Sequence, residues 1–163
     1  QKAAEKYDLK IETIETPASE LSMLEDQSFD LIINPVSNCF FENLEPVWDE
    51  CRRVLKPGGR LIYGFNNPIS YLFDYDLANF KDQFHLKYSQ PYSDLESLSE
   101  EEKKKFLATE NPLEFGHSLD SQIGDLLKRG FLMAGLYKDV WDDEKEVINQ
   151  FFPQFITAFM IKQ

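Results

Sequence analysis

Few side chains in this sequence have the types and spacing that acid–base or nucleophilic chemistry requires. His117, in the segment EFGHSL before a predicted helix, is the better of two histidines as a general base, because imidazole titrates near neutral pH. A histidine that only hydrogen-bonds near a helix start is the alternative interpretation. The sequence shows no nucleophilic triad and no group of residues with metal-ligand spacing. It therefore predicts neither a metal centre nor triad catalysis.

The elements that would position such chemistry are clearest between residues 29 and 65. Residues 29–34 (FDLIIN) form a continuous apolar, β-prone run, which is typical of a strand covered on both faces. After Asn43, apolar residues recur at helical spacing until the stop signal KPGG at residues 56–59. Residues 60–65 then form a second apolar strand. Two strands joined by one helix predict a parallel βαβ unit with a right-handed crossover.

This unit resembles part of a known family. Phe29-Asp30 at a strand start, followed one helix later by RVLKPGG (residues 53–59) and another strand, is similar to the fourth and fifth strands of class I S-adenosylmethionine-dependent methyltransferases. The blocks at 91–95, 112–119 and 122–124 resemble a bacterial, methyltransferase-11-like branch of that family. The resemblance implies a methyl transferase (EC 2.1.1.-) that uses S-adenosylmethionine.

The fold expected from this resemblance is α/β, a partial Rossmann-like sheet. It would contain strands equivalent to the family's third to seventh, with the last strand antiparallel between the fifth and sixth. The expected strands are residues 10–16, 29–34, 60–65, 131–137 and 155–161. We expect one domain over residues 1–163, amino-terminally truncated, with a helical insertion or lid at about 68–117.

The family's main cofactor-binding elements are not recognisable in this sequence. Class I methyltransferases bind the cofactor with a glycine-rich loop after the first strand and an acidic residue that ends the second. Here the only glycine pair, Gly58-Gly59, opens a strand instead of leaving one. The sequence is therefore expected to be the carboxyl-terminal part of a methyltransferase, with S-adenosylmethionine as the cofactor of the complete enzyme.

The resemblance implies cofactor contacts at two places. After the predicted third strand, the loop that faces adenine in the family corresponds to Pro17, Ala18 and Ser19. Pro17 stands where an acidic residue is common, so contacts there would come from the backbone, and a plain surface loop is the alternative. After the fourth strand, the family's backbone lines the methionine end and the acceptor. The matching residues are Asn34, Pro35, Val36 and Ser37.

The insertion is rich in aromatic residues. Tyr71, Tyr88, Tyr92 and Phe115 are candidates for the lining of a substrate pocket. Such clusters also pack cores and lids, and that alternative stays open. The insertion follows the carboxyl end of a strand, where folds of this kind place lids and substrate pockets.

The charge and composition of the chain limit the classes of partner that it is expected to bind. The 163 residues include 29 acidic and 17 basic residues, a formal net charge of −12, which disfavours nucleic acids and anionic membranes. A small-molecule substrate fits better. Cys39 and Cys51 are interpreted as free thiols. Because no signal peptide or long apolar run is visible, we expect a cytoplasmic protein.

The function that best fits these observations is methyl transfer from S-adenosylmethionine to a small-molecule acceptor, and we expect this chain alone to be inactive or impaired. The alternative is a non-catalytic remnant or interaction module. In that case the strand at residues 29–34 would have an open edge, covered by residues 10–16 or by a second copy in a homodimer. A nicotinamide dehydrogenase is less compatible with the pattern. The identity of the methyl acceptor is left open.

Overall fold

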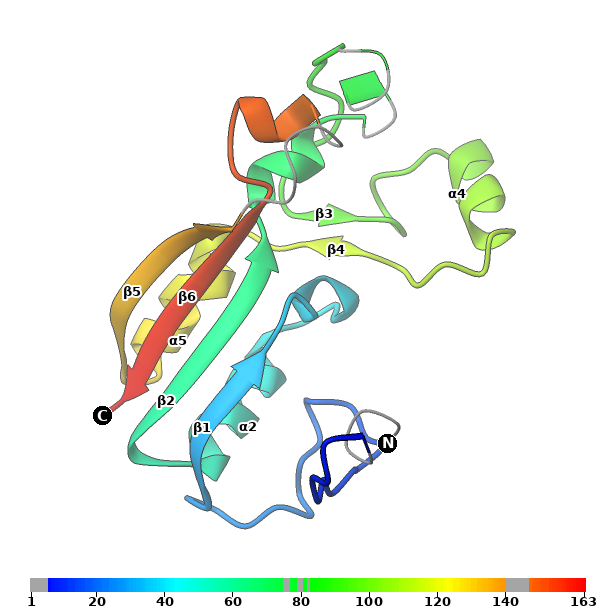
Figure 1. Cartoon of the computed structure of the whole chain (residues 1–163). Helices are drawn as coiled ribbons and strands as arrows, with labels where there is room; N and C mark the ends of the chain where they lie inside the picture. The colour runs from blue at the N-terminus through cyan, green and yellow to red at the C-terminus, as the bar shows by residue number, and fades with distance from the viewer. Residues whose placement is uncertain (1–5, 75–76, 79–80, 82, 140–146) are drawn as a thin grey trace.

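A computed structural model describes residues 6–74, 77–78, 81, 83–139 and 147–163 of the chain. One mixed sheet organises these residues (Figure 1). Its strands are β1 (Phe29–Asn34), β2 (Leu55–Asn66), β5 (Phe131–Asp139) and β6 (Phe155–Lys162), in the spatial order β1-β2-β6-β5. The sequence also predicts a short helix from Asp142 to Gln150, stopped by Pro153, but residues 140–146 lie outside the described residues.

The strand directions confirm the expected topology. β1 and β2 are parallel, whereas β6 is antiparallel to both of its neighbours, β2 and β5. The last strand is therefore inserted antiparallel, as the resemblance implied. β2 begins at Leu55, earlier than the predicted residue 60, because the KPGG segment is already extended. Gly58 has a φ of +76°, a conformation that glycine adopts without strain.

Two helices cover one face of the sheet (Figure 1). α2 (Glu45–Val54) joins β1 to β2, and α5 (Asp125–Lys128) precedes β5. The predicted apolar stripe of α2 is buried, and Trp48 on it is fully enclosed and contacts the ring of Tyr63 at 5.2 Å between centroids. Leu61, Phe65 and Met160 belong to the same core cluster. Burial of this stripe is the main driving force for the fold.

The expected strand at residues 10–16 is wrong, since this segment has no regular structure. Ile11 and Ile14 are exposed by 61% and 53%. A strand needs a neighbour for its backbone N–H and C=O groups, and this segment pairs with none of the described strands. It does not cover β1 either, because within the described residues β1 pairs only with β2 and its other edge is unpaired.

The insertion expected at about 68–117 extends beyond the carboxyl ends of β1 and β2 (Figure 1). It contains a two-stranded ladder of β3 (Tyr92–Ser93) and β4 (Phe115–Gly116). Between them lies α4 (Glu100–Leu107), which begins with a capping box of Ser99 and Glu102. Short helical turns complete the chain: η1 (Asn38–Phe40), η2 (Pro68–Leu72), η3 (Asp120–Gly124) and η4 (Val147–Gln150).

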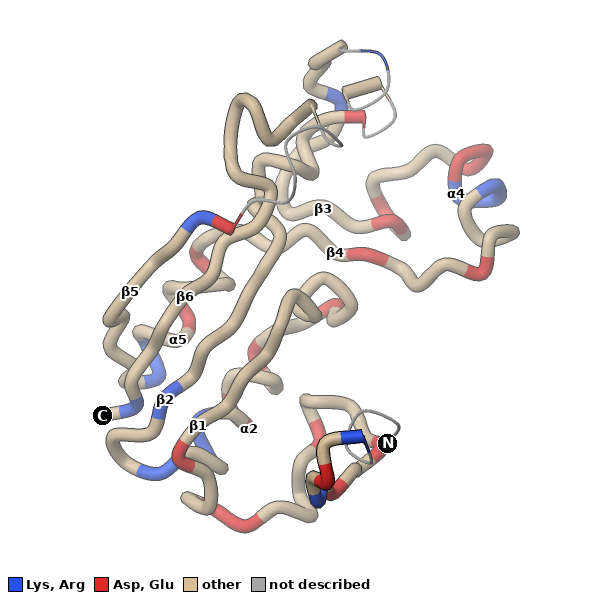
Figure 2. Tube along the Cα trace, viewed as in Figure 1, with Lys and Arg blue, Asp and Glu red and all other residues tan. Residues whose placement is uncertain are grey.

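Charged residues are distributed unevenly along the sheet. Figure 2 shows Lys and Arg gathered at the start of β2, at the end of β6 and around α5. At this end, Lys162 donates from Nζ to the carbonyl oxygens of Arg52 and Leu55, both at 2.6 Å, and so caps the end of α2. None of the helices in the described part of the chain is both long and apolar enough to cross a membrane.

Candidate functional site

The loop after β1 is pressed against β2. Val36 has a φ of +36°, which is unusual for a β-branched residue and is a form of local strain found at functional sites. It lies close to Gly64 of β2, where an added Cβ would stand 2.9 Å from the Val36 Cγ2 atom. Glycine at position 64 therefore allows the close approach of the loop to the sheet.

Side-chain hydrogen bonds hold this loop. Ser37 donates from its hydroxyl to Asn34 Oδ1, and Asn34 donates from Nδ2 to Asn38 Oδ1 at 2.9 Å. Asn38 in turn donates to Gln122 Oε1 at 2.7 Å. Asn38 and Gln122 are both buried. Sequence reasoning missed these two residues as a pair, because 84 positions separate them and no periodicity marks the contact.

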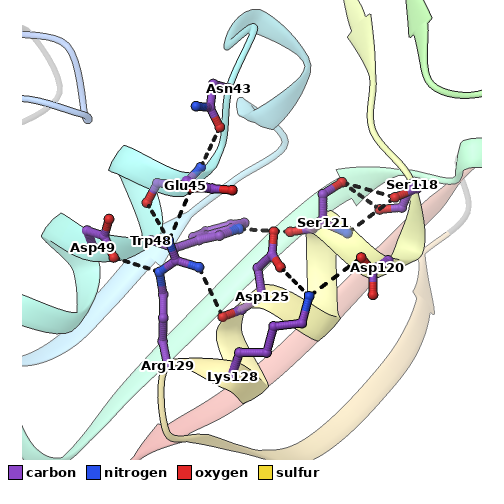
Figure 3. A network of polar contacts seen from close by, with 10 residues as sticks. All are labelled: Asn43, Glu45, Trp48, Asp49, Ser118, Asp120, Ser121, Asp125, Lys128 and Arg129. Carbon is purple, nitrogen blue, oxygen red and sulfur yellow. Dashed lines mark hydrogen bonds and ion pairs between the residues drawn. The ribbon is translucent and has the colours of Figure 1, made fainter.

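Contacts between α2 and the segment before β5 hold Ser121, the residue that precedes Gln122 (Figure 3). Trp48 donates from Nε1 to the Ser121 carbonyl at 2.9 Å, and Arg129 donates from Nε to Asp49 at 2.6 Å. On the sheet side, Tyr63 donates its hydroxyl to the Gln122 carbonyl at 2.7 Å. Burial raises the pKa of Tyr63, so its hydroxyl stays a donor.

The loop expected to face adenine lies beside β1. Pro17 accepts a backbone hydrogen bond from Glu20 at 2.9 Å, which makes a turn that contains Ala18 and Ser19. Ala18 packs against the core, and Ala18 and Asn34 line the same cavity of about 280 Å³ at the open edge of β1. Pro17 and Ser19 are not among its lining residues. The structure thus brings together Ala18, from the predicted adenine loop, and Asn34, from the predicted loop after the fourth strand.

Arg53 holds the segment after this turn, residues 21–26, in place through hydrogen bonds and ion pairs. Its guanidinium donates to the carbonyl oxygens of Leu21 and Leu24 at 2.7 and 2.8 Å and forms ion pairs with Glu50 and Asp26. Glu50 also accepts from the Leu21 N–H at 2.8 Å. The hydrogen bond from Arg53 lowers the pKa of Glu50. The cavity beside β1 therefore has a fixed outer wall.

His117, the candidate base, is half-buried next to η1. Its Nε2 atom lies 2.7 Å from the carbonyl oxygen of Phe41, a group that only accepts hydrogen bonds. Burial lowers the pKa of His117, although the carbonyls of Phe41 and Asn38 favour the protonated form. The imidazole is therefore neutral at pH 7, and it is attached to the same loop as Asn38.

The insertion gathers the aromatic candidates. The rings of Tyr71 and Tyr92 stack at 5.2 Å, and Tyr88 meets Tyr92 edge-on at 5.1 Å. Phe115 is the β4 residue that pairs with Ser93 of β3, directly beside Tyr92 along the chain. The four predicted pocket residues thus lie in one small substructure. The described cavities do not reach them.

Polar residues that the sequence did not single out surround these rings. Tyr71 accepts from Asn66 Nδ2 at 2.6 Å and donates to Glu114 Oε2 at 2.9 Å. Tyr92 donates to Asp94 at 2.7 Å. Burial, and then the nearby Asp94 carboxylate, raise the pKa of Glu114. Burial and Glu114 together raise the pKa of the Cys39 thiol to about 11. The insertion end of the sheet is thus acidic and partly dry.

No group of three or more His, Cys, Asp or Glu residues within the described ranges is arranged to hold a metal ion. The arrangement that remains is a strained loop, a neutral histidine and an aromatic cluster, all beyond the carboxyl ends of parallel strands. This is the edge at which Rossmann-like α/β proteins bind their ligands. The fold and this edge define a class I methyltransferase architecture.

Comparisons with known proteins agree with this class. Residues 1–63 match the family model described as "Methyltransferase domain". The uncharacterized methyltransferase YbaJ of Bacillus subtilis (strain 168) is 44% identical over 136 residues, which cover 83% of this chain and 53% of YbaJ. The chain therefore spans about half the length of this curated relative.

Solved structures support the same fold. A methyltransferase of Mesorhizobium loti that depends on S-adenosylmethionine superposes with a TM-score of 0.65 at 12% identity, covering 90% of this chain and 67% of its own. One of Clostridium acetobutylicum gives 0.64 at 16% identity, covering 99% and 68%. At such identities the likeness concerns the fold alone. Together with the sequence matches, it shows that the chain belongs to the class I S-adenosylmethionine-dependent methyltransferases.

Proposed function

We propose that the chain forms the acceptor side of an enzyme that transfers a methyl group from S-adenosylmethionine to a small molecule. The observation that carries this proposal is the strained loop Asn34–Ser37, held between the cavity beside β1 and the aromatic insertion. When bound, S-adenosylmethionine supplies an electrophilic methyl group on a sulfonium. The protein has little covalent work to do, because holding the acceptor in line provides most of the rate.

Each group of residues has a role in this proposal. Backbone groups of Asn34, Pro35, Val36 and Ser37 line the place where methyl donor and acceptor meet, and the turn of Pro17, Ala18 and Ser19 closes the adenine side. Tyr71, Tyr88, Tyr92 and Phe115 hold the acceptor. His117 takes up the acceptor's proton if the acceptor carries one at neutral pH.

Composition supports the choice of acceptor and location. With a net charge of −12, the chain repels polyanions, so a neutral or cationic small molecule is the better partner. We further propose a cytoplasmic location. The two cysteines, Cys39 and Cys51, are both free and buried, as is usual in a reducing compartment.

A calorimetric titration with S-adenosylmethionine tests the proposal. It is run with the 163-residue chain and with a chain extended upstream, where the gene encodes such a segment. Binding by either one, weakened by Asn34→Ala but not by the exposed control Asn43→Ala, is the expected result. Failure of both chains to bind would contradict the proposal.

The open edge of β1 favours a second candidate, an interaction module. Phe29, Leu31 and Ile33 are exposed by 39%, 44% and 64%, although they belong to an apolar strand. Such an edge is a template for another strand. We propose a second copy of this chain as the occupant. Antiparallel pairing centred on Leu31 sets Leu31 opposite its counterpart and Phe29 opposite Ile33, on one face.

Light scattering distinguishes the two candidates. If the second copy covers the edge, the chain is a dimer, and Ile33→Lys makes it a monomer without loss of fold. The exposed but distant Leu107→Lys serves as the control and leaves the dimer intact. A monomer at all concentrations would refute this candidate.

A further inference from the structure

The hydrogen bonds between Asn34 and Gln122 form a continuous relay of three amides. The relay runs from the end of β1, through Asn38 of η1, to Gln122 of η3. Each link is short, at 2.9 Å from Asn34 to Asn38 and 2.7 Å from Asn38 to Gln122. It thus connects the strained loop to the segment that follows the insertion.

The relay has a direction, because an amide has one accepting oxygen and one donating nitrogen. Gln122 presents its oxygen, so Asn38 must present its nitrogen to Gln122 and its own oxygen to Asn34. Asn34 then presents its nitrogen to Asn38, which leaves its oxygen to accept from Ser37. The orientation of Gln122 therefore fixes the orientation of Asn34.

Burial makes this arrangement rigid. Asn38 is exposed by 0% and Gln122 by 3%, so neither amide can exchange its partner for water. An inverted amide would set two oxygens or two nitrogens against each other in a dry environment, which is costly. A single amide of the relay therefore cannot invert without its neighbours.

The far end of the relay is attached to the core by its backbone. The Gln122 carbonyl accepts from Tyr63, and its N–H donates to the Ser118 carbonyl at 3.0 Å. Asp120–Gly124 is a turn of π-helix, an element that recurs at functional sites. The side chain of Gln122 is thus free to serve the relay while its backbone is held independently.

We propose that Gln122 and Asn38 are positioning residues for methyl transfer. They act through Asn34. They fix the orientation of its side chain and the backbone conformation of Val36, at the place where donor and acceptor meet. The inference rests on the proposed function for its catalytic meaning. The geometric part, control of Asn34 by Gln122, stands independently.

The geometric part is tested by NMR of the side-chain amide of Asn34 in the chain without any ligand. Gln122→Met removes the oxygen that accepts from Asn38 Nδ2, so the Asn38 side chain is no longer held in one orientation, and the Asn34 amide signals shift or broaden. Gln122→Glu, which again presents an oxygen, restores them. Tyr63→Phe breaks only the bond to the Gln122 backbone and leaves the Asn34 signals in place.

Two results would overturn the geometric part. One is an unchanged Asn34 amide in a folded Gln122→Met chain, and the other is an equal change in Tyr63→Phe, which would indicate general loosening. If Gln122→Met does not fold, Gln122→Ala also lacks the accepting oxygen and gives the same test.

The catalytic part is measured by methyl transfer in the longest chain that the gene encodes. Gln122→Met is expected to lower kcat by up to about 100-fold with little change in KM for S-adenosylmethionine, since misplacement of reacting groups affects mainly the chemical step. An unchanged kcat would refute the positioning role. If the unmodified chain transfers no methyl group, the proposed function is refuted. The NMR signals of the Asn34 amide would still show whether Gln122 controls the orientation of Asn34.

Discussion

The two faces of the sheet differ although the same strands build both. On the face covered by α2 and α5, the row of Ile32, Leu61 and Met160 runs across β1, β2 and β6, and Leu61 and Met160 are fully buried. One residue further along, the row of Ile33, Ile62 and Phe159 lies on the opposite face. There Ile33 is exposed by 64%, and the other two are half-buried.

Apolar residues therefore have different roles on the two faces of the sheet. On the covered face they stabilise the fold, because helices remove them from water. On the open face and at the β1 edge the described residues enclose them less, and the exposed ones are available to another segment or molecule. The candidate binding loop lies where these two environments meet, at the end of β1.

The largest effect is expected at the centre of the covered face. Trp48→Ala removes a fully buried ring and its hydrogen bond to Ser121, and we expect a loss of about 3–5 kcal/mol in the free energy of unfolding. Urea denaturation followed by far-UV circular dichroism measures it. A loss below about 1 kcal/mol would show that the covered face does not dominate stability.

The covered face was also the region most accessible from sequence. The strand at residues 29–34, the stripe of α2 and the KPGG stop are local signals, and the structure confirms all three. The expectation that this strand is covered on both faces is wrong, because Leu31 and Ile33 are exposed by 44% and 64%. The antiparallel last strand came from the family resemblance. Residues 10–16 carry a similar alternation of apolar residues but form no strand, because a strand also requires a neighbour, which local pattern does not reveal.

Of the candidate site, the sequence indicated the loop and the aromatic residues but not what connects them. Asn38 with Gln122, and Tyr71 with Glu114, are contacts between distant segments that no spacing rule predicts. Gln122 did lie within a block that resembled the family. That resemblance marked the segment without indicating which side chain points toward the loop.

Acidification provides a test of intermediate size at the half-buried His117. Burial holds the pKa of His117 below its unfolded value of about 6.5, so on acidification the unfolded chain takes up this proton first. The contribution of His117 to stability is fully present above about pH 6.5 and is lost as the pH falls toward the folded pKa, by about 1.4 kcal/mol for each unit of pKa difference.

Replacing His117 removes this contribution. The unfolding free energy of His117→Gln should therefore fall less between pH 7 and 5 than that of the unmodified chain. The control is Asn111→Gln, since Asn111 is exposed and carries no titratable proton, so this substitution should leave the pH profile in place. An identical profile for His117→Gln and the unmodified chain would contradict burial of this imidazole.

The smallest effect is expected on the open face. Ile33→Ser replaces an exposed side chain, and the unfolding free energy of the monomer should change by no more than about 0.5 kcal/mol. Leu61→Ser, in the adjacent row of the covered face, should cost several times more, because it buries a hydroxyl and leaves a cavity. Denaturation at two protein concentrations distinguishes the sources of any larger effect at Ile33. A loss that grows with concentration indicates a second copy on the edge, whereas a large loss independent of concentration would mean that this face is covered within the chain, and the contrast between the two faces would fail.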